Sequence, residues 1–129
     1  MLIDRRRPRP RGPLALAALA CALSTAGCDG QATAGDRTDA HGAVHLIRSY
    51  GCGGCHEIPG VEGATGRVGP PLNGIGRRVF LAGMLRNEPQ SMIRWLRDPQ
   101  SVVPGNAMPN MGITEDDART IAAYLATLR

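Results

Sequence analysis

The sequence contains no lysine: all 15 of its basic residues are arginine. Aromatic residues are also scarce, at 3% of 129 residues. Large aromatic side chains supply much of the buried apolar area in a small core. Their scarcity fits a core of aliphatic side chains and alanine, or a core completed by a bound cofactor. Composition alone does not separate these two possibilities.

The excess of positive charge is confined to one end of the chain. The net charge is +4, and residues 1–27 hold five arginines and one aspartate, which leaves ten basic and ten acidic residues in the rest. The chain also lacks a basic stripe with interleaved aromatics, the pattern that single-stranded nucleic acid requires. We therefore expect no nucleic-acid partner.

The N-terminal arginines precede an apolar run of 12 residues, 14–25. At about 1.5 Å of rise per residue, this run is too short to cross a hydrocarbon core of about 30 Å. A basic, then apolar, then small-residue order is typical of a secretory signal, which we predict for residues 1–27. Residues 25–28, Thr-Ala-Gly-Cys, resemble a bacterial lipobox, with Thr25 where an aliphatic residue is usual. The resemblance implies a lipid on Cys28; plain cleavage or a retained anchor are the alternatives.

A polar segment separates this signal from the rest of the chain. Residues 29–39 are small or polar and show no apolar periodicity. We predict a flexible tether over residues 28–40 and a single domain over 41–129. With a lipid on Cys28, the tether would hold the domain at the periplasmic side of the bacterial inner membrane; a soluble periplasmic protein is the alternative.

Two of the four cysteines lie in the domain and form one motif, Cys52-Gly-Gly-Cys55-His56. This is the C-x-x-C-H pattern of c-type haem attachment. Two thiols reach the vinyl groups on one porphyrin edge, the next histidine reaches the iron, and glycines allow a tight turn between them. We predict one haem c bound covalently through Cys52 and Cys55, with His56 on the iron. A disulfide or redox dithiol, or a zinc site using His41 and His45, are the alternatives.

Residues 41–129 resemble class I cytochromes c. Residues 69–74, Gly-Pro-Pro-Leu-Asn-Gly, are similar to the family's Gly-Pro-x-Leu-x-Gly. The resemblance implies that the Pro70 carbonyl accepts a hydrogen bond from Nδ1–H of His56, which leaves Nε2 for iron. It also implies an all-α cytochrome c fold, with three to four short helices wrapped around the haem.

The sixth iron ligand must be chosen among five methionines. The resemblance implies Met108, which follows a Pro/Gly loop and precedes Pro109, and gives Met111 a packing role near the haem edge. Met111 itself, His41 or His45 are the alternatives. A thioether ligand favours ferrous iron and raises the reduction potential.

Two helices are predicted at the ends of the domain. The first covers residues 40–50, with Val44, Leu46 and Ile47 inward. The last begins at Thr114, where Asp117 stands at the third helical position of a capping-box variant. In the family these helices cross at a small residue on the first helix. We assign that role to Gly42, although Arg48 occupies the position of the family's aromatic residue.

A third helix lies between them. Asn87 is the predicted cap, Pro89 suits the first turn, and the helix ends before Pro99. The resemblance implies that Trp95 on this helix contacts the haem; an ordinary core tryptophan is the alternative.

Two arginines follow the glycine turn at residues 74–76. The resemblance implies that one of them binds a haem propionate, for which a planar guanidinium is suited. We favour Arg77 over Arg78, and a solvated surface charge is the alternative for each.

Ligation by His56 and Met108 would leave no open site on the iron, and therefore no small-molecule substrate. The sequence thus predicts a single-electron carrier of a membrane respiratory chain, with a terminal oxidase or a dehydrogenase as redox partner. An electron-transfer subunit of a larger oxidoreductase is a second possibility. A haem-based sensor with a labile Met108 is a third.

Overall fold

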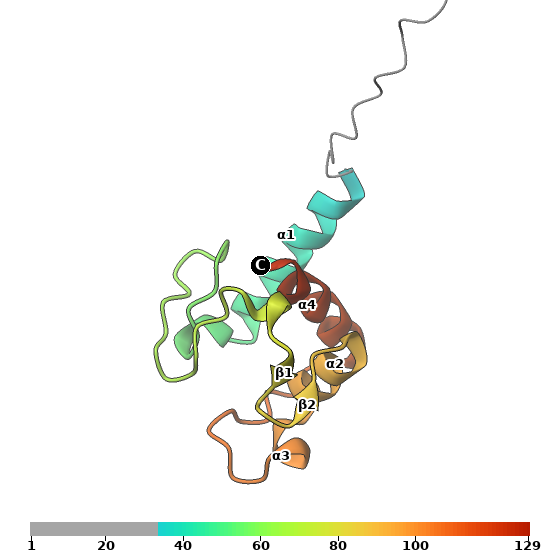
Figure 1. Ribbon diagram of the computed structural model, residues 1–129. Helices are drawn as coiled ribbons and strands as arrows, with labels where there is room; N and C mark the ends of the chain where they lie inside the picture. The colour runs from blue at the N-terminus through green and yellow to red at the C-terminus, as the bar shows by residue number, and fades with distance from the viewer. Residues whose placement is uncertain (1–33) are drawn as a thin grey trace, which may run out of the picture. The chain divides into compact units, whose positions relative to one another are not determined.

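Four α-helices form the framework of the described chain, residues 34–129, in the computed structural model (Figure 1). The predicted helical fold is confirmed, with the addition of a two-stranded antiparallel hairpin. The predicted signal and Cys28 lie outside the described residues. No helix within 34–129 is long and apolar enough to span a membrane. In chain order the elements are α1 (Ala34–Ser49), the 3-10 turns η1 (Cys52–Gly54) and η2 (Ile75–Arg77), β1 (Phe80–Leu81), β2 (Leu85–Arg86), α2 (Pro89–Arg97), α3 (Pro99–Val102) and α4 (Glu115–Thr127).

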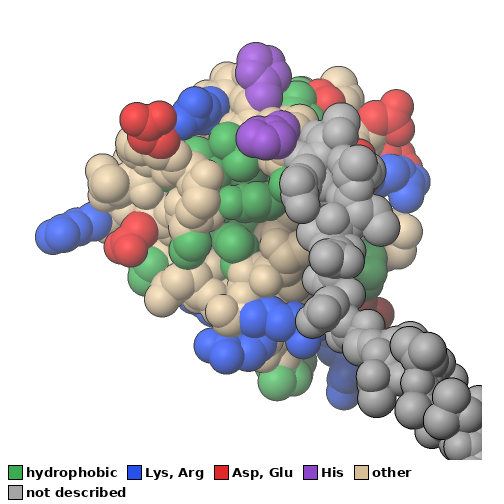
Figure 2. Space-filling model, turned by 90° about the horizontal axis from the view of Figure 1, so that it is seen from above, with side chains coloured by type: hydrophobic (Ala, Val, Ile, Leu, Met, Phe, Trp, Pro, Cys, Tyr) green, Lys and Arg blue, Asp and Glu red, His purple; other side chains and the backbone are tan. Residues whose placement is uncertain are grey.

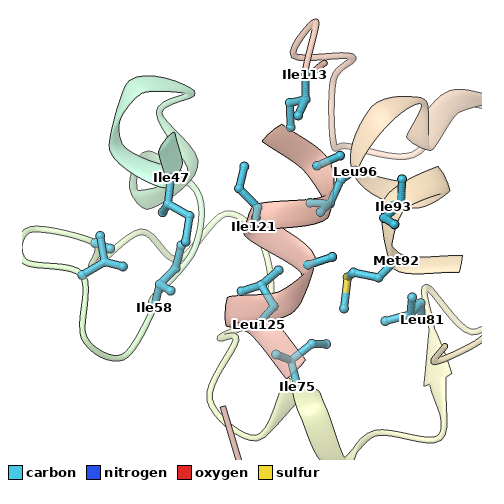
Figure 3. Packing of buried hydrophobic residues seen from close by; sticks show 14 residues of the cluster. Ile47, Ile58, Ile75, Leu81, Met92, Ile93, Leu96, Ile113, Ile121 and Leu125 are labelled. Carbon is cyan, nitrogen blue, oxygen red and sulfur yellow. The ribbon is translucent and has the colours of Figure 1, made fainter. Parts of the chain in front are cut away.

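The core is built around α4, which packs against α1, α2 and η2. Figure 3 shows Ile121 and Leu125 of α4 lying between Ile47 and Ile58 on one side and the apolar face of α2 on the other. Every buried hydrophobic residue of the described chain is aliphatic, alanine or methionine. Complete burial of such an aliphatic side chain contributes about 1.5–3 kcal/mol. This part of the core is therefore aliphatic, as the composition allowed.

The contact between α1 and α4 differs from the prediction at its small residue. A Cβ added at Gly42 would meet no atom within 4 Å, whereas Ala43 is 1% exposed. Ala43 is thus the small residue that α1 buries, and the assignment to Gly42 is wrong. Ile47 is also buried, while its neighbour Arg48 turns outward and pairs with Glu62 at 3.1 Å. The helix begins at Ala34 and not at residue 40, so it includes part of the segment predicted as a tether.

The start of α4 is capped as predicted and is also bonded to the end of α1. Thr114 Oγ1 accepts a hydrogen bond from the Asp117 amide at 3.2 Å. The Tyr50 hydroxyl donates to Asp117 Oδ2 at 2.6 Å. The hydrogen bond from Tyr50, and after it the hydroxyl of Thr114, lowers the pKa of the Asp117 carboxyl, and the contact with Asp117 raises the pKa of Tyr50. One carboxylate therefore joins the two helices.

Tyr50→Phe is expected to make the free energy of unfolding less sensitive to low pH. A carboxyl whose folded pKa is lowered stabilises the protein above its unfolded pKa, and this contribution is lost as the pH falls through the folded value. The window for Asp117 lies below its usual pKa of 3.8. Denaturant unfolding at a series of pH values should show a shallower acid-induced loss in the variant than in the wild type.

Tyr124→Phe is the matched control for that experiment. The Tyr124 hydroxyl donates to the uncharged Pro59 carbonyl at 2.6 Å. Its removal should lower the free energy of unfolding without changing the acid dependence. If the free energy of unfolding fell equally at low pH in the wild type and in Tyr50→Phe, the role of the Tyr50–Asp117 bond would be contradicted.

The cap of α2 is one residue later than predicted. The helix begins at Pro89 after Glu88, whose side chain makes no capping bond. The Asn87 amide is used elsewhere: Nδ2 donates to the Ile75 carbonyl at 2.8 Å and to the Arg78 carbonyl at 2.9 Å. Asn87 therefore holds the η2 turn in place and does not cap α2.

Candidate functional site

The C-x-x-C-H motif forms a tight turn directly after α1. The amides of Cys55 and His56 both donate to the Cys52 carbonyl, at 3.2 and 3.0 Å. Cys52 and Cys55 are free thiols and both are half-buried. Burial raises the pKa of the Cys52 thiol. The turn thus presents two unpaired sulfur atoms, followed at once by an imidazole.

The chain returns behind this turn and fixes its shape. The Gly66 amide donates to the Gly53 carbonyl at 3.0 Å, and the Gly69 amide donates to the Cys55 carbonyl at 2.8 Å. A Cβ added at Gly53 would lie 2.8 Å from the Cα of Ala64. Gly53 therefore has to be a glycine, because two backbone segments approach each other closely at this position.

His56 is held in one orientation by two contacts. Its Nδ1 lies 2.8 Å from the Pro70 carbonyl oxygen. Since a carbonyl oxygen only accepts, Nδ1 must carry the proton, and the lone pair of the neutral ring is on Nε2. Gly69 packs on the ring, because an added Cβ would lie 2.7 Å from Nδ1 and 2.8 Å from Nε2. The hydrogen bond that the family resemblance implied is present.

The methionines of the described chain differ in their surroundings. Met92 is buried in the core, while Met84 is 66% exposed. Met108 is half-buried and packs against the same hydrophobic cluster as Cys52. Met111 is 37% exposed and lies outside that cluster, so the packing role predicted for it is not a role in the core. Met108 is thus the methionine that is neither fully buried nor left at the surface.

The other residues predicted to contact haem, Trp95, Arg77 and Arg78, differ in how exposed they are and in what they bond. Trp95 is half-buried on α2 and stands outside the core cluster. Arg77 and Arg78 are both exposed, and the Arg78 guanidinium donates to the Pro71 carbonyl at 2.6 Å, beside Pro70. This contact of Arg78 was not foreseen. The alternative ligands of α1, His41 and His45, are both exposed.

Apolar side chains are not confined to the core. Figure 2 shows hydrophobic side chains at the middle of one face and charged side chains around its edge. Large exposed hydrophobic residues of the described chain include Val68, Val79 and Phe80. Among the described side chains, residues 39–129, no three His, Cys, Asp or Glu residues are grouped so that they could hold a metal ion among themselves.

Comparison with known proteins identifies the family. The cytochrome c family matches residues 42–129, which include the motif, the Pro70 segment and Met108. The chain belongs to the cytochrome c family. It is similar to cytochrome c2 iso-2 of Magnetospirillum molischianum, 33% identical over 92 residues that cover 60% of this chain and 91% of the relative. No solved structure gave a significant match.

Other relatives of this cytochrome are much longer proteins. Cytochrome c oxidase subunit 2 of Alkalihalophilus pseudofirmus is 35% identical over 85 residues, which cover 65% of this chain and 24% of the relative. The corresponding subunit of Bacillus subtilis is 32% identical over 81 residues, 23% of its length. The cytochrome therefore spans about a quarter of these oxidase subunits.

The residues of this cytochrome fit the haem c that the family carries. Both thiols are free, and His56 has its proton on Nδ1 and its lone pair on Nε2. Bound haem c supplies a one-electron couple at iron, so the family assignment makes this chain a class I electron-transfer protein. The same assignment favours haem over the zinc and disulfide alternatives.

Proposed function

We propose that this cytochrome is a single-electron carrier with one haem c, held through Cys52 and Cys55 and ligated by His56 and Met108. The observation that carries the proposal is the bond from His56 Nδ1 to the Pro70 carbonyl, at 2.8 Å. It keeps the proton on Nδ1 and leaves the lone pair of Nε2 free, so Nε2 would be the atom that binds iron. The half-buried Met108, packed against the hydrophobic cluster, supports the choice of sixth ligand.

His56 and Met108 would both be iron ligands supplied by the protein. A haem held in this way would have no coordination site left for a substrate and would supply a one-electron couple. Trp95, half-buried and outside the core cluster, is the residue proposed to pack beside the haem. Arg77 or Arg78 would bind a propionate. These residues bind and orient the haem and keep water from it.

The proposed setting is a membrane respiratory chain on the periplasmic side of the bacterial inner membrane. The similarity to oxidase subunit 2 supports a redox partner such as a terminal oxidase. A lipid on Cys28 would hold the protein near that partner. Mass spectrometry of the mature protein tests this anchor: a diacylated Cys28 at the N-terminus supports it, and an unmodified soluble protein contradicts it.

The carrier is tested with protein produced alongside haem-maturation machinery. We expect one covalent haem per chain, a reversible one-electron titration, and no binding of carbon monoxide by the ferrous form. A colourless protein with free thiols would overturn the haem assignment. Ready binding of carbon monoxide would contradict a stable Met108 ligand and favour the sensor.

A second function follows from the longer relatives. In cytochrome c oxidase subunit 2 of Alkalihalophilus pseudofirmus, the similar region is 24% of a larger protein. The same domain could therefore serve as an electron-accepting subunit of an oxidoreductase complex. Purification of the full chain from its native membrane under mild detergent distinguishes the two, because a subunit co-purifies with a catalytic partner in fixed ratio and a carrier does not.

A further inference from the structure

The segment that carries Met108 is held by the side-chain amides of Gln100 and Asn106. It begins with α3, whose cap Asp98 accepts from the Ser101 amide at 3.1 Å. Beyond α3 it turns at Gly105, where φ is +79°. This irregular stretch has few backbone partners of its own, so side chains must satisfy its polar groups.

Gln100 uses both ends of its amide on this segment. Nε2 donates to the carbonyl of Met108 at 2.8 Å and to the carbonyl of Asn106 at 3.0 Å. Oε1 accepts from the amide of Gly105 at 3.0 Å. A single half-buried side chain therefore joins the start of α3 to both sides of the turn.

Asn106 completes the arrangement from within the turn. Its Oδ1 accepts from the Met108 amide at 2.8 Å. Its Nδ2 donates to the carbonyls of Pro99 and Val103, at 3.0 and 2.7 Å. Both backbone polar groups of Met108 are thus bonded to these two amides. The backbone of Met108 is fixed on its N–H side by Asn106 and on its carbonyl side by Gln100.

We propose that Gln100 and Asn106 are positioning residues that fix the backbone of Met108 for ligation of the haem iron. The inference rests on the proposed function, in which Met108 is the sixth ligand. Methionine is flexible, with three rotatable side-chain bonds, so a mobile backbone would add to the entropy lost when sulfur binds iron. A backbone ordered in advance avoids that loss and lets sulfur exclude competing ligands.

A role confined to stability is the competing explanation, and the segment offers a control for it. Asn110 follows Met108 closely, and its Oδ1 accepts only from the Gly112 amide, at 3.0 Å. It therefore orders the same region through a hydrogen bond that does not involve Met108. Gln90, an exposed residue of α2, is the corresponding control for Gln100.

The test is competition for the iron by imidazole in the matured ferric protein. Gln100→Leu and Asn106→Ala are compared with Gln90→Leu and Asn110→Ala, and the long-wavelength absorption band of sulfur-ligated ferric haem reports Met108. Gln100→Leu and Asn106→Ala each remove three hydrogen bonds of the segment, one of them to the backbone of Met108, and should tighten apparent imidazole binding about tenfold. The control variants should stay within about twofold of the wild type.

Gln100→Glu tests the two donated hydrogen bonds without changing the size of the side chain. It keeps the oxygen that accepts from Gly105 and removes the NH2 group that donates to Met108 and Asn106. It should behave as Gln100→Leu does, and it remains available if the leucine variant fails to fold. Unfolding by denaturant is measured in parallel on all variants. The proposal requires that the Gln100 and Asn106 variants gain more affinity for imidazole than their loss in free energy of unfolding explains.

The outcomes are distinguishable. A wild-type protein that lacks the sulfur band overturns the ligation by Met108 and this inference with it. A wild type that shows the band, with Gln100 and Asn106 variants that bind imidazole as the controls do, overturns this inference alone. An increase in imidazole affinity fully explained by lost global stability also overturns it.

Discussion

Met108→Ala is expected to abolish the ferric absorption band of sulfur ligation and open the iron to external ligands. The alanine methyl group cannot coordinate iron, so the ferrous form should bind carbon monoxide. The reduction potential should fall by on the order of 0.1 V or more, because axial ligands set haem potentials over a range of about 0.8 V. Optical spectroscopy and potentiometric titration measure both effects.

Met111→Ala is the matched control, since Met111 lies three residues along the same segment and is 37% exposed. It should keep the band, and its potential should be close to that of the wild type. The reverse pattern, with the band lost in Met111→Ala and kept in Met108→Ala, would reassign the ligand. Absence of the band from the wild type itself would point to a nitrogen ligand such as His41 or His45, whereas a band kept in both variants would point to another methionine.

Gly69→Ala is expected to disturb His56 and with it the binding of haem. The added methyl group would lie 2.7 Å from Nδ1 of the imidazole, so the ring must tilt away or the backbone must shift. Either movement strains the hydrogen bond to the Pro70 carbonyl. Overpacking of this kind costs about 1–3 kcal/mol. The yield of haem protein and the free energy of unfolding should both fall.

Gly54→Ala is the control for that variant. It lies within the haem motif itself, yet an added Cβ there would meet no atom within 4 Å. It keeps the C-x-x-C-H spacing and should give haem protein of near wild-type stability. Equal losses in the two variants would show that the motif tolerates no methyl group at all, and would remove the specific role of Gly69 against the imidazole.

The features predicted correctly from the sequence depend on short-range chemistry. The C-x-x-C-H spacing is itself the attachment chemistry, so a haem-binding family could be predicted without a structure, and the family match over residues 42–129 agrees. The cap of α4 is likewise local, because Thr114 and Asp117 are three residues apart. The bond between His56 and Pro70 spans 14 residues and was reached through the family resemblance, not from local rules.

The features that were missed depend on distant partners. Asn87 has the composition of a helix cap, but its amide is taken by carbonyls 12 and 9 residues earlier. The β1–β2 hairpin was missed because its turn places a non-glycine residue, Ala82, at a φ of +48°. The Asn-Gly or Asp-Gly pair that signals a hairpin belongs to two-residue turns, whereas this connection covers residues 82–84. Whether Gly42 or Ala43 meets α4 depends on the rotation of a helix, which apolar spacing fixes only approximately.

The separations along the chain between bonded residues imply an order of assembly. His56 bonds a residue only 14 positions away, whereas the contacts of Tyr50 and Tyr124 with their partners span 67 and 65 residues. The entropy lost in closing a chain segment grows with its length, so short closures are favoured early. The haem motif and the segment behind it can therefore organise before the first and last helices meet. Haem can therefore attach to this local nucleus first, with the terminal helices closing over it afterwards.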